Sequence, residues 1–266
     1  MRTDVFRDVY DRRNRILWLT LAFQGGFMNA GGFLVCGQFV SHITGYGTQV
    51  GMSMASQGLY AALEIGLAPL FFLAGALFAG WLVDRRLTQG REPMLRLGII
   101  ALATLNLVVF SGEELGLLGE FGENLVFQRD YILLFSLCFA CGLQNGLFTS
   151  LTGGLVRTTH LTGPTTDVGL ALTRLMAMGP GDPERGKLAS TTWLRGQNIA
   201  AFSAGSMIAT PVFTVLSYAG FALPFTTSLF LVAYIHWRLS GPPERRANRE
   251  PIDGALKAPV SVPRPE

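Results

Sequence analysis

One short motif able to bind a small molecule occurs twice in the chain, with its two histidines 118 residues apart. The first copy runs from His42 to Gly45 and the second from His160 to Gly163, and both read His-x-Thr-Gly. Imidazole can donate a hydrogen bond, accept one or carry a proton near neutral pH. Threonine favours a helix N-cap, and glycine permits a tight turn. The motif therefore predicts two non-helical elbows, each followed by a half-helix capped by its threonine.

The start of each half-helix would present free backbone N–H groups and the positive end of the helix dipole. Two such ends meeting inside a membrane would form a polar pocket suited to an anionic or carbonyl-bearing solute. In the second copy Asp167 replaces Gln49 and could hold a proton or a cation, while Arg157 replaces Phe39 and supplies a positive charge. The predicted solute-binding residues are Asn29, His42, Thr44, Gly45, Gln144, Asn145, Arg157, His160, Thr162, Gly163 and Asp167.

The same residues also have purely structural interpretations. The elbows could be packing corners without a ligand, and Asp167 could form an ion pair with Arg157. Arg195 could simply anchor its helix at the membrane surface. The sequence contains no nucleophile–base pair, nucleotide loop or cluster of metal ligands. We therefore expect no enzymatic activity, no cofactor and no metal site.

The composition is that of a membrane protein. Only 15% of the residues are charged, against about a quarter in a soluble domain. Six segments of the chain are poor in charge and are long enough to cross a bilayer or nearly so. They predict an all-α fold with about six transmembrane helices. These segments are residues 16–37, 67–83, 97–112, 131–154, 196–223 and 225–237.

The basic residues predict the orientation of these helices. Arginines and lysines precede the first span, separate the second from the third and the fourth from the fifth, and recur in the tail. The loop after the third span is instead mainly acidic. Six spans with both termini in the cytoplasm place every basic cluster inside, as the positive-inside rule requires.

The duplication divides the membrane domain, residues 16–238, into two repeats of about residues 16–112 and 131–238. Because each repeat contains three spans, an odd number, the two copies must have inverted topology. Gly75 with Ala79, and Gly205 with Ala209, predict equivalent helix-packing seams. Residues 1–15 form a cytoplasmic segment, and the proline-rich residues 239–266 predict a disordered cytoplasmic tail.

The second repeat closely resembles the YoaK family of bacterial membrane proteins, a domain of unknown function. The resemblance is carried by Gly142 to Asn145, Arg157 to Gly163 and Thr166 to Gly169, and it extends over about residues 15–238. It implies about six transmembrane helices in the bacterial inner membrane and no established substrate.

The leading functional hypothesis is a small secondary transporter or permease for a small polar solute, anionic solutes included. The alternative is a non-transporting membrane protein with a structural or regulatory role. The expected partners are the lipid bilayer, a solute and a second copy of the chain in a homodimer. The sequence contains no patch of basic and aromatic residues of the kind that binds nucleic acid.

Overall fold

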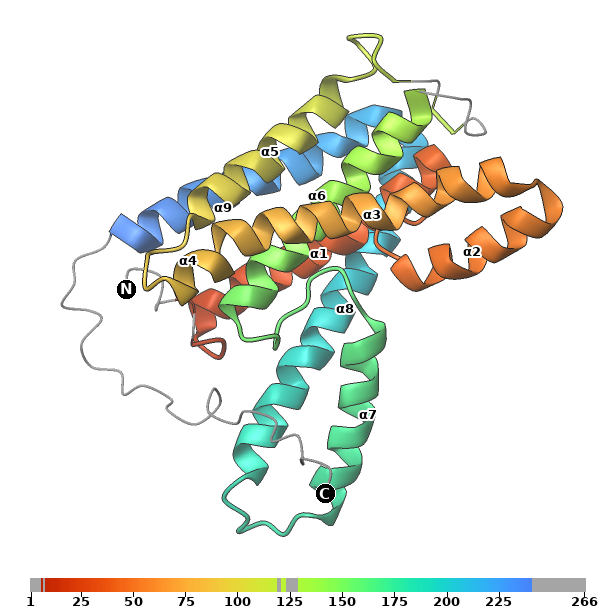
Figure 1. Ribbon diagram of the computed structural model, residues 1–266. Coiled ribbons are helices and arrows are strands. Elements are labelled where there is room, and N and C mark those ends of the chain that lie inside the picture. The colour runs from red at the N-terminus through yellow and green to blue at the C-terminus, as the bar shows by residue number, and fades with distance from the viewer. Residues whose placement is uncertain (1–5, 7, 119–120, 123–128, 241–266) are drawn as a thin grey trace, which may run out of the picture.

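The protein is a bundle of helices that differ greatly in length (Figure 1). The computed structural model describes residue 6 and residues 8–118, 121–122 and 129–240. The predicted tail lies outside the described residues, apart from its first two positions. In chain order the helices are α1 (Arg12–Cys36), α2 (Ile43–Ser56), α3 (Leu59–Leu82), α4 (Asp84–Thr88), α5 (Leu95–Ser111), α6 (Arg129–Leu151), α7 (Thr162–Ala177), α8 (Arg185–Leu216), the 3₁₀ helix η2 (Ser217–Phe221) and α9 (Ala222–Ser240).

Within the residues that the structure describes, four helical runs are long and apolar enough to cross a membrane. They are Arg12–Cys36, Leu59–Thr88, Tyr131–Leu151 and Arg185–Ser240, and the last of these contains α8, η2 and α9 together. The apolar α5 is shorter, at 17 residues. Large apolar side chains lie on the outside of the bundle, as on a surface solvated by lipid. The prediction of an all-α membrane protein agrees with these helices.

Several helix ends follow directly from the sequence. The Asp11 carboxylate accepts a hydrogen bond from the Arg13 N–H and caps α1. Gly37 ends α1 with a left-handed φ of +63°, a conformation that favours glycine. Gly58, with φ of +95°, separates α2 from α3. Helix α3 continues through Pro69 without interruption.

Other predicted boundaries were wrong. The span expected at residues 67–83 begins at Leu59, and the span expected at residues 196–223 begins at Arg185. Both helices start in segments that contain polar or charged residues, so a search for charge-poor spans does not include these segments. The 3₁₀ helix η2 separates α8 from α9, and the backbone of Ser217 has a positive φ.

Helices α1 and α8 pack with their backbones in direct contact. A Cβ atom on Gly26 of α1 would lie 1.9 Å from the carbonyl oxygen of Phe202 in α8. A Cβ atom on Gly205 of α8 would lie 2.0 Å from the carbonyl oxygen of Phe23 in α1. Only glycine permits this approach, so one glycine from each helix forms the seam.

Helices α3 and α6 pack in the same way. A Cβ atom on Gly142 of α6 would lie 2.0 Å from the carbonyl oxygen of Phe72 in α3, and one on Gly75 of α3 would lie 2.1 Å from that of Phe139 in α6. These are the positions that the sequence duplication equates with those of the first seam. The predicted packing role of the Gly75 and Gly205 segments is thereby confirmed.

Two helical hairpins extend from the bundle in different directions (Figure 1). One consists of α2 and the beginning of α3, and the other of α7 and the first half of α8. In the second hairpin the Arg185 guanidinium donates to the carbonyl oxygens of Leu175 and Met178, each at 2.6 Å. These bonds satisfy the end of α7, where backbone carbonyls lack helical partners.

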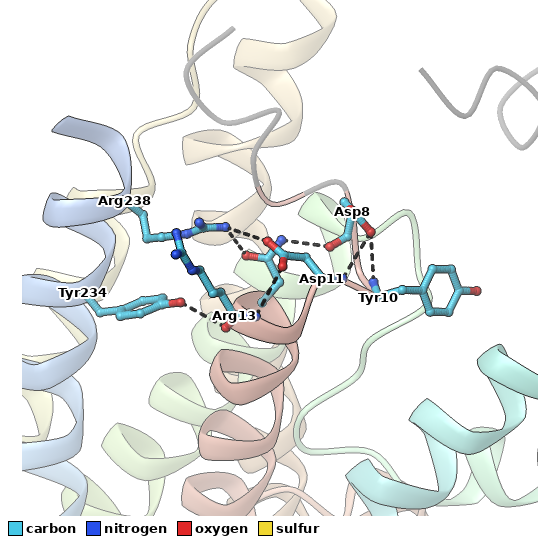
Figure 2. A network of polar contacts seen from close by, with 7 residues as sticks. Asp8, Tyr10, Asp11, Arg13, Tyr234 and Arg238 are labelled. Atoms are coloured by element: carbon cyan, nitrogen blue, oxygen red, sulfur yellow. Dashed lines mark hydrogen bonds and ion pairs between the residues drawn. The ribbon is translucent and has the colours of Figure 1, made fainter. Parts of the chain in front are cut away.

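The segment before α1 is held against the end of α9 by a polar network, here called the N-terminal clamp (Figure 2). The Arg238 guanidinium forms an ion pair with Asp11 at 3.2 Å and donates to the Asn14 side chain at 2.9 Å. The Tyr234 hydroxyl donates to the carbonyl oxygen of Arg13 at 3.0 Å. The side chains of Arg238 and Asp11 are only 9% and 13% exposed, so the network is largely shielded from water.

Candidate functional site

In both copies of the motif the histidine ring folds back over the glycine three residues later. A Cβ atom on Gly45 would lie 3.2 Å from the His42 ring, and one on Gly163 would lie 3.4 Å from the His160 ring. At His160 the ring also accepts a 3.4 Å hydrogen bond from the Gly163 N–H through Nε2. The His-x-Thr-Gly spacing is thus explained, because glycine leaves room for the ring against the first turn of the short helix.

The predicted capping role of the threonines was wrong. The N-cap positions are His42 and Leu161, so Thr44 and Thr162 lie inside the first turns of α2 and α7, with exposed side chains. An N-cap side chain must precede the helix to reach its free N–H groups. At the second elbow the His160 ring fills this role instead of the threonine.

Each elbow packs against the first helix of the other half. The buried Tyr46 of α2 places its hydroxyl 3.8 Å from the Cys138 sulfur in α6. At the second elbow, the carbonyl oxygen of Thr158 lies 2.4 Å from where a Cβ atom on Gly25 of α1 would be. The two elbows therefore both lie against the central helices α1 and α6.

Gln144 links these central helices to the second elbow. Its side chain is fully buried, and Nε2 donates to the Leu21 carbonyl oxygen at 2.9 Å and to the Thr158 hydroxyl at 3.2 Å. The Leu21 carbonyl oxygen can only accept a hydrogen bond, so the Gln144 amide atom that faces it must be the Nε2 donor. Among the described residues, the remaining Oε1 atom of Gln144 is buried without a hydrogen-bond partner.

The equivalent asparagines of the two halves have different environments. Asn29 Oδ1 accepts hydrogen bonds from the backbone N–H and the hydroxyl of Ser41, at 3.0 and 2.8 Å. In the second half the corresponding residues are Asn145 and Thr159. Asn145 Oδ1 and Thr159 Oγ1 are both buried and lack a partner within the described part of the chain. At the first elbow Asn29 and Ser41 satisfy each other, and Gln38 Oε1 is the atom buried without a partner in the described residues, whereas at the second elbow the equivalents of Asn29 and Ser41 both lack partners.

Asp167 forms an ion pair with Arg195 of α8 at 3.0 Å, and the expected pair with Arg157 was wrong. Arg157 is exposed and lies near the start of α7, with its Nη1 atom 3.6 Å from where a Cβ atom on Gly163 would be. Burial, and then the charge of Arg157, lower the pKa of His160 below its usual value of 6.5. A neutral His160 is what the hydrogen bond from Gly163 requires, since Nε2 must be unprotonated to accept it.

Sequence reasoning missed Asn198, which is buried with an unpartnered Oδ1 atom as judged from the described residues. It lies one helical turn beyond Arg195 in α8, so the antiparallel pairing of Asp167 with Arg195 brings it to the level of the α7 N-terminus. A signal was present, since Asn198 is a neutral polar residue within a helix that otherwise reads as a membrane span.

A second buried polar cluster was also missed, where α1, α5 and α9 meet. Gln24 donates to the Ser228 hydroxyl at 3.1 Å and accepts from the Thr227 hydroxyl at 2.8 Å. Asn106 donates to the same Ser228 oxygen at 3.0 Å and to the Pro224 carbonyl oxygen at 3.3 Å. The cluster joins three helices by hydrogen bonds, which is typical of an interhelical contact in a membrane, and the Asn106 Oδ1 atom is buried without a partner among the described residues.

Comparison with known proteins gives a match to one family. The family model described as a protein of unknown function (DUF1275) matches residues 17–235, which cover most of the chain and agree with the extent of the sequence resemblance. No curated protein and no solved structure matches the chain.

Proposed function

The chain belongs to the DUF1275 family, and we propose that it is a small secondary transporter that binds a polar solute at the second elbow. The observation that carries this proposal is the group of buried, unpartnered oxygen atoms of Gln144, Asn145 and Thr159 in the part of the chain that is described. Such atoms are rare in folded proteins because each lost hydrogen bond costs about 1–3 kcal/mol. A bound solute would supply the missing donors.

The proposed architecture has six crossings, made by α1, α3, α5, α6, α8 and α9. With both termini in the cytoplasm of a bacterial cell, the arginines before α1 and around α4 lie on the inner side of the membrane. Each half then crosses three times, and the second half enters from the opposite side. The equivalent glycine contacts of the two seams support this pseudo-symmetry.

In this proposal α2 and α7 are half-helices that enter the membrane domain from opposite sides. The polar elbows at their N-termini lie against α1 and α6, where irregular backbone is covered by protein. The second elbow is the binding element because it carries Arg157 and the open oxygens. The first elbow, in which Asn29 and Ser41 are hydrogen-bonded to each other, forms the opposite wall of the proposed binding site.

The test of transport starts with a thermal-shift screen of the purified full-length protein against small organic and inorganic solutes. Each hit is then measured for uptake into proteoliposomes. Arg157→Gln should abolish uptake while leaving folding intact, whereas Arg174→Gln, the same charge change on the exposed face of α7, should have little effect. Uptake by Arg157→Gln equal to the parent would contradict the proposed site.

The inverted arrangement has its own test. Cysteines introduced by His42→Cys and Ile43→Cys at the first elbow, and by His160→Cys at the second, are treated in intact cells and in inverted vesicles with a membrane-impermeant maleimide. The native Cys36, Cys138 and Cys141 are buried, so background labelling should be low. The elbows should label from opposite faces, or resist labelling if covered. Equal labelling of both from one face would rule out the inverted arrangement.

A further inference from the structure

Three oxygen atoms of the second elbow lack a hydrogen-bond partner among the described residues: those of Gln144 and Asn145 on α6, and the Thr159 hydroxyl on the chain that follows α6. Gln144 Oε1 can only accept, because Nε2 is committed to Leu21 and Thr158. Asn145 Oδ1 and Thr159 Oγ1 are likewise buried without partners among the described residues. In the first half the equivalents of Asn145 and Thr159, namely Asn29 and Ser41, lie within 3.0 Å of each other. An amide oxygen accepts hydrogen bonds and a threonine hydroxyl can accept one, so each of the three oxygens could take an N–H donor of a primary ammonium group.

The chain before α7 also carries a group of the opposite character. The Arg157 guanidinium lies beside the positive N-terminal end of α7. Both features favour a carboxylate, which arginine can hold with two parallel hydrogen bonds. The first half has the N-terminus of α2 but no guanidinium beside it, because Phe39 replaces Arg157. The second elbow thus combines a surface for a cation with a surface for an anion.

We propose that the solute of the second elbow is a small zwitterion, with a primary ammonium group and a carboxylate as in an amino acid. This inference rests on the proposed binding site and specifies its ligand class. The ammonium group donates to the oxygens of Gln144, Asn145 and Thr159, and the carboxylate accepts from Arg157. A simple anion leaves the buried oxygens without donors, and a simple amine leaves Arg157 without a counter-charge.

The test uses matched sets of compounds on the purified full-length protein. Glycine, L-alanine and L-serine are each compared with the carboxylate that lacks the amino group and with the amine that lacks the carboxylate. For alanine these are propionate and ethylamine. Thermal shift and isothermal titration should detect binding of at least one amino acid, with its two truncated analogues at least about tenfold weaker. Equal binding of an amino acid and its carboxylate or amine would overturn the inference, and so would binding of none.

Thr159→Val separates a binding role from a structural one. The substitution keeps the shape of the side chain and its methyl contact with Gly25, and it removes a buried oxygen that has no partner within the described residues. The variant should therefore melt at a higher temperature than the parent without solute, yet bind the amino acid about tenfold more weakly. A variant that melts lower, or that binds as tightly as the parent, would contradict the assignment.

Arg157→Gln should weaken the same amino acid at least about tenfold, while Arg174→Gln should not change its affinity. Uptake measurements on the same preparations separate this inference from the proposed function. Binding of the amino acid without uptake would refute transport and leave the ligand class standing. Uptake of another solute, with no binding of any amino acid, would refute the ligand class and leave transport standing.

Discussion

Replacing a seam glycine by alanine should destabilise the protein far more than the same change elsewhere. At Gly26, Gly75, Gly142 and Gly205 the new Cβ atom would lie about 2 Å from a backbone carbonyl oxygen, where ordinary contacts begin at 3.4 Å. The helices would have to separate by more than 1 Å, which removes dispersion contacts along the whole seam. Overpacking of this kind costs about 3 kcal/mol, and more where the obstructing atom is backbone.

The matched control is Gly169→Ala in α7. No atom lies within 4 Å of the position that its Cβ would occupy, and Gly169 lies in the helix interior. Alanine should therefore stabilise this helix by about 0.5–1 kcal/mol. For a chain of this size, a seam variant should melt about 6–12 °C below the parent, and the control slightly above it.

The assay is thermal unfolding in a mild detergent, followed by tryptophan fluorescence. The two glycines of one seam should also be coupled: once Gly26→Ala has separated α1 from α8, Gly205→Ala should add little, because both relieve the same contact. Gly26→Ala with Gly142→Ala should be close to additive, since these glycines lie in different seams. Equal melting temperatures for Gly205→Ala and Gly169→Ala would refute the reasoning.

Two further predictions concern charge. The folded protein keeps the pKa of His160 below 6.5, so this residue should not reduce the free energy of unfolding above that pH, and the free energy should fall as the pH drops below it, by at most about 1.4 kcal/mol per pH unit. His160→Asn should remove this dependence. Melting curves of both proteins between about pH 5 and pH 8 test the prediction. Arg238→Gln should cost about 3 kcal/mol, because it leaves the shielded Asp11 without this ion pair. A double-mutant cycle with Asp11→Asn checks the pair, and simple additivity of the two changes would contradict it.

The duplication predicted where the short helices begin and where the long helices pack closely. Both short helices begin at the His-x-Thr-Gly motif, and the glycine seams occur at the equivalent positions that were identified. These features could be predicted because a helix start and a close helix contact depend on local residue types.

The partners of individual side chains could not be predicted in the same way. Asp167 pairs with Arg195, which is distant in the sequence and belongs to another helix. Gln24 and Ser228 meet only because α1 and α9 pack together. The role of the histidine as a cap depends on the direction of its ring, which is determined by packing against Gly163. Each of these contacts arises from tertiary structure, about which residue spacing contains little information.

The arrangement of the seams has a consequence for biogenesis. Helix α1 of the first half packs on α8, and α3 packs on α6, so each glycine groove is filled by a helix of the other half. When the ribosome has completed the first half, its two long helices are in the membrane without the surfaces that will cover them. The seam of α3 with α6 can form once α6 has been inserted, whereas the seam of α1 with α8 must wait for α8.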